Sequence, residues 1–277
     1  MSKTLLIPLV STGNVPQLTI DLVLHSLADE FQFVTSLDST YIHPFTGPLD
    51  YVYEQQRPVL FTSSPDKRYS TGLELFYSDQ SSLYVLQQRT PIIQGYVNNF
   101  IKEVIVPLVV EYNIREVVIV DSFGVLDEDV MATASVSFRT SSNFFSDGIC
   151  EVRSVGDMIQ RFQSGLHLNE ESTNEISTSL FTFTANSVQQ EISTNQQIFK
   201  FAYHLLNATA PNLESIKYSS VFVHEGDNSE DAHLFCDHLP EIIHSLTKIS
   251  TLTPPISWKG VYGSRPIPAS FVDGIYI

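Results

Sequence analysis

Hydrophobic and polar residues alternate along the start of the chain in a way that predicts strands and a helix in turn. The apolar run over Thr4–Val10 predicts a first strand, and a Ser-Thr-Gly-Asn turn follows it. Apolar positions in Pro16–Asp29 recur at helical spacing, with the proline near the first turn, where it is tolerated. Phe31–Leu37 then predicts a second strand. Proline and glycine interrupt the pattern over Tyr41–Arg68, which predicts a long surface excursion.

The middle of the chain holds the clearest helical pattern, with strand patterns on both sides. Leu73–Tyr77 and Ser82–Gln88 are rich in β-formers, which predicts a hairpin or two neighbouring strands. Within Tyr96–Tyr112, apolar residues recur at three- and four-residue spacing, and Pro107 should kink this helix or end its regular hydrogen bonding. Val117–Val120 is an unbroken β-branched run, which is typical of a strand buried on both faces. This order of elements predicts an α/β fold with a largely parallel central sheet.

The second half of the chain is less regular. We expect helices over Ile198–Asn207 and Ser229–Ile249, the second with a break at Pro240, and a buried strand over Tyr218–Val223. The polar stretches Ser135–Gly148 and Asn169–Ser179 predict loops or insertions. From Thr253 to Ile277, prolines and glycines predict an extended tail, with one strand near Val261.

Composition narrows the classes of partner. The 277 residues are 43% hydrophobic and carry a formal net charge of -16. This charge disfavours nucleic acid and anionic lipid, and it favours partners with basic patches. No apolar stretch is long enough to span a membrane, and the apolar start is too short for an export signal. Cys150 and Cys236 are expected to be buried thiols in a reducing compartment, so we predict the cytoplasm, with the nucleus as a second location.

The sequence contains few motifs that would indicate a catalytic site. Glycine-rich phosphate loops, a Walker sequence and a Gly-x-Ser-x-Gly elbow are all missing. Asp121-Ser122 should lie at the carboxyl end of a central strand, where α/β enzymes bind ligands, although a capping or turn role is the alternative that we favour. His224–Ser229 lacks zinc-protease spacing, and we expect Gly226 and the polar residues after it to shape a turn and cap a helix.

Two further groups of residues have a functional and a structural interpretation. His233, Cys236 and His238 could suggest a metal site, but His238 should point away from the other two on a helix, so we predict no metal or cofactor. Arg89 is a basic residue in an acidic chain. It either pairs with a carboxylate inside the fold, which we favour, or reaches a partner.

The last three residues, Ile275, Tyr276 and Ile277, form a hydrophobic-Tyr-any ending. Pro266 and Pro268 favour an extended approach, and the glycine before Ile275 frees the end. Such an ending can place its carboxylate against a lysine or a backbone nest, its phenol in a slot and its aliphatic residue on the wall. A frayed terminus is the alternative.

Several motifs along the chain resemble the proteasome assembly chaperone 2 family, particularly its fungal members. They are Pro8-Leu9-Val10-Ser11 with Gly13-Asn14 and Pro16-Gln17-Leu18, Gly47-Pro48-Leu49-Asp50, Gln87-Gln88-Arg89-Thr90-Pro91 with Asn98-Asn99-Phe100, Leu166-His167-Leu168-Asn169, Ser215-Ile216-Lys217-Tyr218, Glu225-Gly226-Asp227-Asn228-Ser229 and Ile256-Ser257-Trp258-Lys259-Gly260. Their order along nearly the whole chain makes the resemblance far more specific than any one of them.

The resemblance implies a fold and a role. The fold is a three-layer sandwich, a central sheet between helices, so we expect one chaperone domain over 1–263 and a docking tail over 264–277. The role is to pair with proteasome assembly chaperone 1, bind the outer face of the proteasome α-ring, promote its assembly and keep activators off immature particles. Family tails enter pockets between α-subunits, which implies that role for Ile275, Tyr276 and Ile277. No catalytic residues carry over, and Ser135–Asn143 and Glu170–Ser179 match poorly and receive no function.

Three hypotheses follow. The first is an assembly chaperone that binds without turnover. The second is an α/β enzyme that acts on a small molecule at the Asp121-Ser122 strand end, which requires a concave pocket there with convergent polar groups. The third is a relic of the fold that forms only a generic heterodimer.

Overall fold

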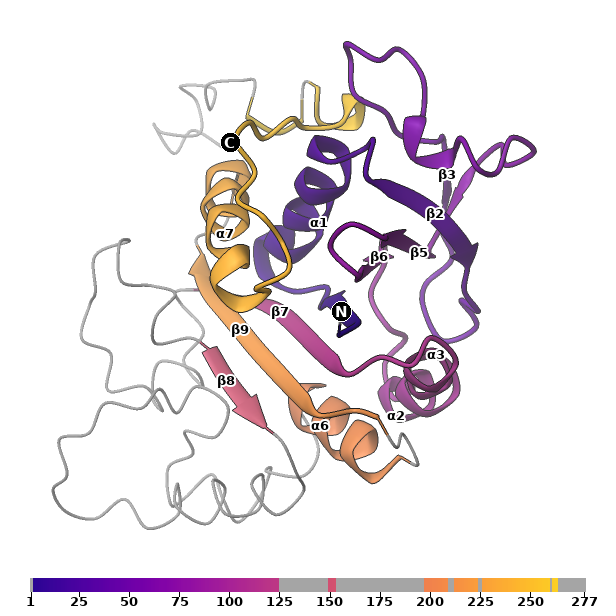
Figure 1. Ribbon diagram of the computed structural model, residues 1–277, viewed down its shortest axis with the longest axis vertical. Coiled ribbons are helices and arrows are strands. Elements are labelled where there is room, and N and C mark those ends of the chain that lie inside the picture. Colours follow the sequence, from indigo (N-terminus) through magenta and orange to yellow (C-terminus); the bar gives the residue numbers. More distant parts are fainter. Residues whose placement is uncertain are drawn as a thin grey trace, which may run out of the picture.

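The computed structural model describes residues 2–124, 149–152, 197–208, 212–223, 226–259 and 261–263. Its centre is a seven-stranded sheet with the order β2-β5-β6-β1-β7-β9-β8 (Figure 1). The strands are β1 (Thr4–Pro8), β2 (Phe31–Ser36), β5 (Leu73–Ser78), β6 (Leu83–Gln88), β7 (Glu116–Gly124), β8 (Ile149–Val152) and β9 (Ser215–Val223). The four central strands β6, β1, β7 and β9 pair in parallel, and the flanking pairs are antiparallel. The expected α/β fold with a largely parallel central sheet is confirmed.

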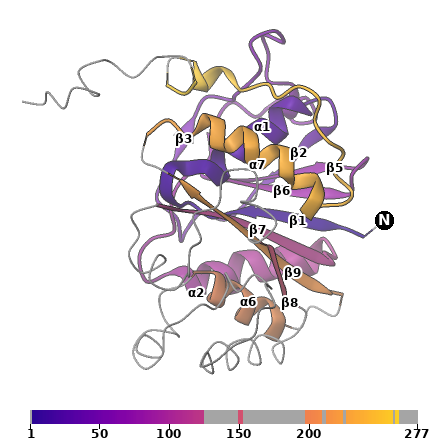
Figure 2. The same cartoon turned by 90° about the vertical axis from the view of Figure 1, so that its left-hand side faces the viewer.

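Helices cover both faces of this sheet, which gives the expected three-layer sandwich (Figure 2). One face carries α1 (Val15–Ser26) and α7 (Ser229–Ile242), and the other carries α6 (Gln197–Asn207) and the series α2 (Val97–Phe100), η3 (Ile101–Ile105) and α3 (Val106–Glu111). Side chains along a strand alternate between the two cores. Leu5 and Ile7 pack in the core under α6, whereas Leu6 packs in the core under α1. Both cores exclude water, so Val117–Val120 in β7 is apolar without alternation and buried on both faces, as predicted.

Pro107 changes the hydrogen bonding of its helix as expected. The five residues before Val106 form a π-helical turn, in which the Val106 N–H donates to the Ile101 carbonyl, five residues earlier. A proline removes one donor and crowds the carbonyl four residues before it, and a wider turn relieves that crowding. The helix therefore continues through Pro107 as α3.

Three predicted boundaries are wrong. β7 does not end at Asp121 but continues to Gly124, because β9 keeps pairing with it after β1 has ended at Pro8. α7 runs through Pro240 without a break and ends at Ile242, short of Ile249. Val261 lies in a turn rather than in a strand.

The excursion after β2 has a small structure of its own. It contains the two-stranded ribbon of β3 (Thr46–Gly47) and β4 (Ser70–Thr71) and the 3-10 turn η2 (Val59–Phe61). Two further 3-10 turns are η1 (Thr12–Asn14), which links β1 to α1, and η5 (Ile256–Trp258), near the end of the described chain. In Figure 1 this last segment, coloured yellow, runs past α1 toward the excursion.

Candidate functional site: the root of the C-terminal tail

The predicted contact residues Ile275, Tyr276 and Ile277 lie outside the described residues, as does the whole predicted tail over 264–277. The structure does describe the segment from which this tail leaves. We call Ile256–Lys259 together with Val261–Gly263 the tail root. Hydrogen bonds from three separate parts of the fold hold it.

The surface excursion provides the first set of contacts. The Ile256 N–H donates to the Tyr51 carbonyl at 2.8 Å. Ser257 donates from its N–H to Oδ1 of Asp50 at 3.3 Å and from its hydroxyl to Oδ2 of the same carboxylate at 2.5 Å. The Lys259 ammonium lies 4.7 Å from the centroid of the Tyr53 ring, within the range of a cation–π contact. Asp50 thus links the Gly-Pro-Leu-Asp motif to the Ile-Ser-Trp-Lys-Gly motif.

A buried carboxylate on α1 provides the second set. Trp258 is 4% exposed, and its indole Nε1 donates to Oδ2 of Asp21 at 3.3 Å. The same carboxylate accepts from Nε2 of Gln87 at 2.8 Å and forms an ion pair with Arg89 at 2.9 Å. Three donors from two distant motifs therefore satisfy one buried negative charge, which is the arrangement that makes such a burial tolerable. The prediction that Arg89 pairs inside the fold is confirmed.

His25, one helical turn after Asp21, borders the same cluster. Its Nδ1 lies 2.8 Å from the Asp21 carbonyl oxygen. Burial lowers the pKa of His25, against the opposing influence of the Asp21 and Asp50 carboxylates, so the ring is neutral at pH 7. With the histidine neutral, Arg89 supplies the positive charge that balances Asp21.

The turn between β9 and α7 provides the third set. Asp227 accepts from the Ser229 N–H at 3.0 Å and from the Gly263 N–H at the end of the tail root. Burial raises the pKa of Asp227, but these hydrogen bonds outweigh it and lower that pKa overall, so the side chain stays ionised. Gly226 has a φ of 131°, and Asp227 binds the first residue of α7. The structural interpretation of this motif is confirmed for 226–229, and His224 and Glu225 lie outside the described residues.

The same turn packs against the turn after β1. Asn228 is 2% exposed, and its side-chain amide donates to the Gly226 carbonyl at 3.1 Å. Gly13 lies directly beneath that amide with a φ of 69°, and a Cβ placed there would come within 2.4 Å of the Asn228 Nδ2. Only glycine suits this position, for its backbone conformation and for its space.

Asp121 and Ser122 are both buried within β7. Asp121 is 8% exposed and accepts from the Ser122 N–H at 2.8 Å and from the Tyr218 hydroxyl at 2.9 Å. Ser122 is 1% exposed, and its hydroxyl lies 2.9 Å from that of Ser11. Burial raises the pKa of Asp121, although these hydrogen bonds oppose it. The predicted turn or capping role is wrong because the pair lies inside β7, where both side chains are buried and form hydrogen bonds within the fold.

The suggested metal ligands each bond elsewhere. Nδ1 of His233 lies 2.6 Å from the Ser229 carbonyl oxygen, Cys236 is buried with its thiol directed at the Thr19 carbonyl, and Nδ1 of His238 lies 3.4 Å from Glu241. Within the described ranges, no three His, Cys, Asp or Glu side chains gather as metal ligands would. No helix in this part of the chain combines the length and apolarity needed to cross a membrane. The expected burial of Cys236 is confirmed, and the side chain of Cys150 is outside the described set.

Comparison with known proteins supports the resemblance. A family model described as the PAC2 family matches residues 5–243. The chain belongs to the PAC2 family. It is 38% identical over 275 residues to proteasome assembly chaperone 2 of Saccharomyces cerevisiae, covering 97% of this chain and 98% of that protein. It is 26% identical to proteasome assembly chaperone 2 of Danio rerio, covering 97% of this chain and 94% of that protein. The resemblance to proteasome assembly chaperone 2 is confirmed.

A search of solved structures gives a more distant likeness. Pyrococcus furiosus PbaA, described as an archaeal homolog of proteasome-assembly chaperone, aligns with a TM-score of 0.49 and 12% identity, covering 90% of this chain and 84% of PbaA.

Sequence reasoning missed Asp21, which joins the tail root to the sheet. It is a buried acidic residue on a helix whose buried positions are mostly apolar, and such a residue needs a partner inside the fold. Its position therefore carried a signal, but nothing in the local pattern indicated that the partners were Gln87, Arg89 and Trp258.

Proposed function

We propose that this PAC2 family chain is a proteasome assembly chaperone of the cytoplasm or nucleus. It pairs with proteasome assembly chaperone 1, binds the outer face of the core-particle α-ring through Ile275, Tyr276 and Ile277, promotes assembly of the ring and blocks activators from binding early. The role rests on the 38% identity to the yeast protein over 97% of this chain.

The observation that carries the tail's role is the anchoring of its root. Asp50, Asp21 and Asp227 come from three separate parts of the fold, and each accepts hydrogen bonds from the tail root. A docking segment gains from a fixed origin, because a fixed origin raises its effective concentration near the pocket that it enters. The fourteen residues 264–277 could span at most about 50 Å from that origin. Two such tails on one heterodimer would form a bivalent clamp.

Binding rather than catalysis also agrees with the burial of Asp121 and Ser122 inside β7. Asp121 and Ser122 are buried and satisfied by Ser11 and Tyr218, so they offer no room for a substrate. We therefore place the chain's activity in its contacts with other proteins.

The test is removal of Ile275–Ile277 from the full chain, co-expressed with the partner chaperone. We expect co-purification of α-subunits to fall at least tenfold, while co-purification of the partner chaperone is unchanged. A matched variant, Ser270→Ala, alters the same predicted tail without touching the ending and should bind as the natural chain does. Unchanged α-subunit recovery after the truncation would rule out the tail's role, and loss of the partner chaperone would show that the ending serves the pairing instead.

A further inference from the structure

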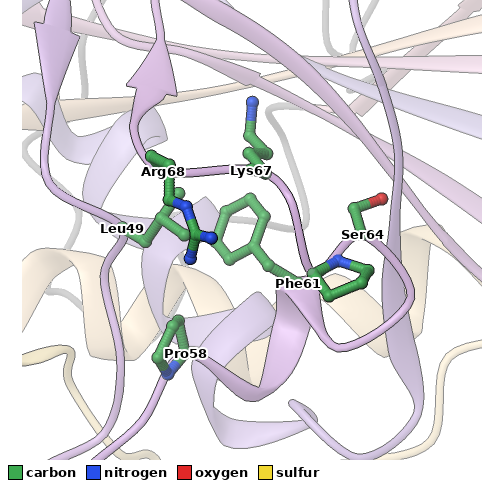
Figure 3. Close-up of a pocket in the computed structure, with 7 residues that line it drawn as sticks. Leu49, Pro58, Phe61, Ser64, Lys67 and Arg68 are labelled. Carbon is green, nitrogen blue, oxygen red and sulfur yellow. The ribbon is translucent and has the colours of Figure 1, made fainter.

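The surface excursion forms a pocket of about 360 Å³ that the proposed tail contact does not use (Figure 3). Its lining combines apolar side chains with two basic ones and a hydroxyl: Leu49, Pro58, Phe61, Ser64, Pro65, Lys67 and Arg68. Pro58 and Phe61 belong to the 3-10 turn η2 and its cap, and Arg68 precedes the ribbon strand β4. The pocket is therefore built almost entirely by one segment of the chain, between β2 and β5.

The two basic side chains of the pocket differ in what they contact. The Lys67 ammonium forms an ion pair with the buried Glu74 at 2.7 Å and lies 4.3 Å from the centroid of the Phe33 ring, and Figure 3 shows it directed away from the pocket. Its charge is already balanced. Arg68 is exposed, and within the described residues its guanidinium forms neither a hydrogen bond nor an ion pair. Figure 3 shows that guanidinium beside Leu49 and facing the Phe61 ring.

The pocket also adjoins the tail root. Leu49 precedes Asp50, the carboxylate that holds Ser257. Tyr69, which follows Arg68, is 56% exposed, and Tyr53, which lies under the Lys259 ammonium, is 60% exposed. Exposed tyrosine and arginine are the residue types that contribute most to protein interfaces. The pocket therefore borders the origin of the tail, so a partner held by the tail can also reach the pocket.

We propose that the pocket binds an exposed segment of the proteasomal protein that the tail engages, in which an Asp or Glu stands beside an aliphatic side chain. The carboxylate pairs with the Arg68 guanidinium, which can receive it through two parallel hydrogen bonds. The aliphatic side chain packs on Phe61 and Pro58. This inference rests on the proposed function, because it names the same partner.

Charge complementarity favours this occupant. A chain with a net charge of -16 repels acidic surfaces in general. The Arg68 guanidinium has no partner among the described residues and lies beside apolar side chains, so it is a place where a carboxylate can be accepted. A second copy of the chain carries the same charge of -16 and is repelled. The contact would fix the orientation of the chaperone on its partner, because it adds a second point of attachment to that of the last three residues.

The test compares Arg68→Glu with Arg57→Glu in the full chain bound to its partner chaperone. Both arginines are exposed and belong to the same excursion, but Arg57 does not line the pocket. Binding to purified α-subunits is measured by interferometry at low and high salt. We expect Arg68→Glu to weaken binding roughly five- to thirtyfold and to reduce its salt dependence. Arg57→Glu should stay within about twofold of the natural chain. Equal effects of the two variants would overturn the pocket's role.

A photo-crosslinking amino acid in place of the pocket-lining Ser64 identifies the occupant. We expect a crosslink to an α-subunit segment that contains Asp or Glu. Crosslinks only to residues 264–277 of the same chain, or only to a second copy, would overturn it. If the natural chain fails to bind α-subunits at all, the proposed function fails as well. Binding that depends on the last three residues but not on Arg68 overturns this inference alone.

Discussion

The indole of Trp258 donates a hydrogen bond to the carboxylate of Asp21, 237 residues earlier in the chain. This contact places the tail root against α1, one of the two helices that cover this face of the sheet. Because Asp21 also holds Gln87 and Arg89 from the end of β6, the position of the root is tied to the centre of the fold rather than to a loop. Movement of α1 or β6 would therefore move the origin of the tail.

The first prediction concerns this carboxylate. Asp21→Ala should lower the free energy of unfolding by about 3 kcal/mol, because it leaves the Arg89 charge, on a side chain that is 18% exposed, without its partner. Urea denaturation followed by circular dichroism measures the loss. Asp29→Ala removes an exposed carboxylate just after the same helix and should change the free energy of unfolding by less than about 0.5 kcal/mol. A similar loss in both variants would show that the Asp21 cluster contributes no special stability.

The second prediction concerns Gly13. Gly13→Ala should destabilise the protein by about 2 to 4 kcal/mol, because it adds a contact with Asn228 to the strain of a left-handed backbone. Gly95→Ala is the matched control. Gly95 has a φ of 88°, but a Cβ there meets nothing within 4 Å, so only the backbone strain of about 1 kcal/mol should appear. Thermal unfolding of both variants separates the two contributions, and equal shifts would mean that Asn228 moves aside without cost.

The third prediction is a pH dependence that arises from Asp121. Its pKa is raised above the ordinary value of 3.8, so the folded state holds the proton more strongly than the unfolded state. The stability of the natural chain relative to Asp121→Asn should therefore fall as the pH rises from about 3.8 through the raised pKa, by about 1.4 kcal/mol for each unit of elevation. Urea denaturation of both chains across this range measures the difference.

The control for this pH dependence is Asp38→Asn. Hydrogen bonds from the Thr40 hydroxyl and N–H lower the pKa of the exposed Asp38. Its contribution to stability is present above the ordinary pKa and is lost as the pH falls, which is the opposite sign to that of Asp121. If the difference in stability changed with pH in the same direction for Asp121→Asn and Asp38→Asn, the pH dependence could not be attributed to the raised pKa of Asp121.

The fourth prediction concerns thiol reactivity. Cys236 is 2% exposed, and burial raises the pKa of its thiol, so almost no reactive thiolate is present at pH 8. In a Cys150→Ser variant, where Cys236 is the remaining cysteine, Ellman's reagent should not react with the folded protein and should react fully after unfolding in guanidinium. Rapid labelling of the folded variant would show that α7 opens away from α1.

Local patterns were sufficient to predict most of the architecture. The unbroken apolar runs of β1 and of the start of β7 reflect burial on both faces of the sheet, and the helical spacing before Pro107 reflects burial that recurs every three to four residues. That recurrence is a property of neighbouring residues in the sequence, so it needs no knowledge of the partner element. The wider turn before Pro107 likewise follows from the chemistry of one residue.

The errors concern features that depend on a distant neighbour. β7 continues beyond Asp121 because β9 still pairs with it, and this pairing turned a supposed strand-end site into a buried, satisfied carboxylate. Val261 has strand-like character but no adjacent strand to pair with among the described residues, so it lies in a turn. The ending Ile275–Ile277 and the division at residue 263 stay predictions, since 264–277 lie outside the described residues.

The sequence by itself determined the α/β class, the parallel centre of the sheet and the membership of the PAC2 family, because each follows from patterns or motifs that can be seen along the chain. Only the tertiary structure decided that Asp21, Asp50 and Asp227 converge on the tail root and that Arg68 lines a pocket without a partner among the described residues. The physical reason is that these side chains meet through the order of the strands and the packing of helices on them. That order brings together residues more than two hundred positions apart, and the spacing of residues along the sequence does not indicate which of them will meet.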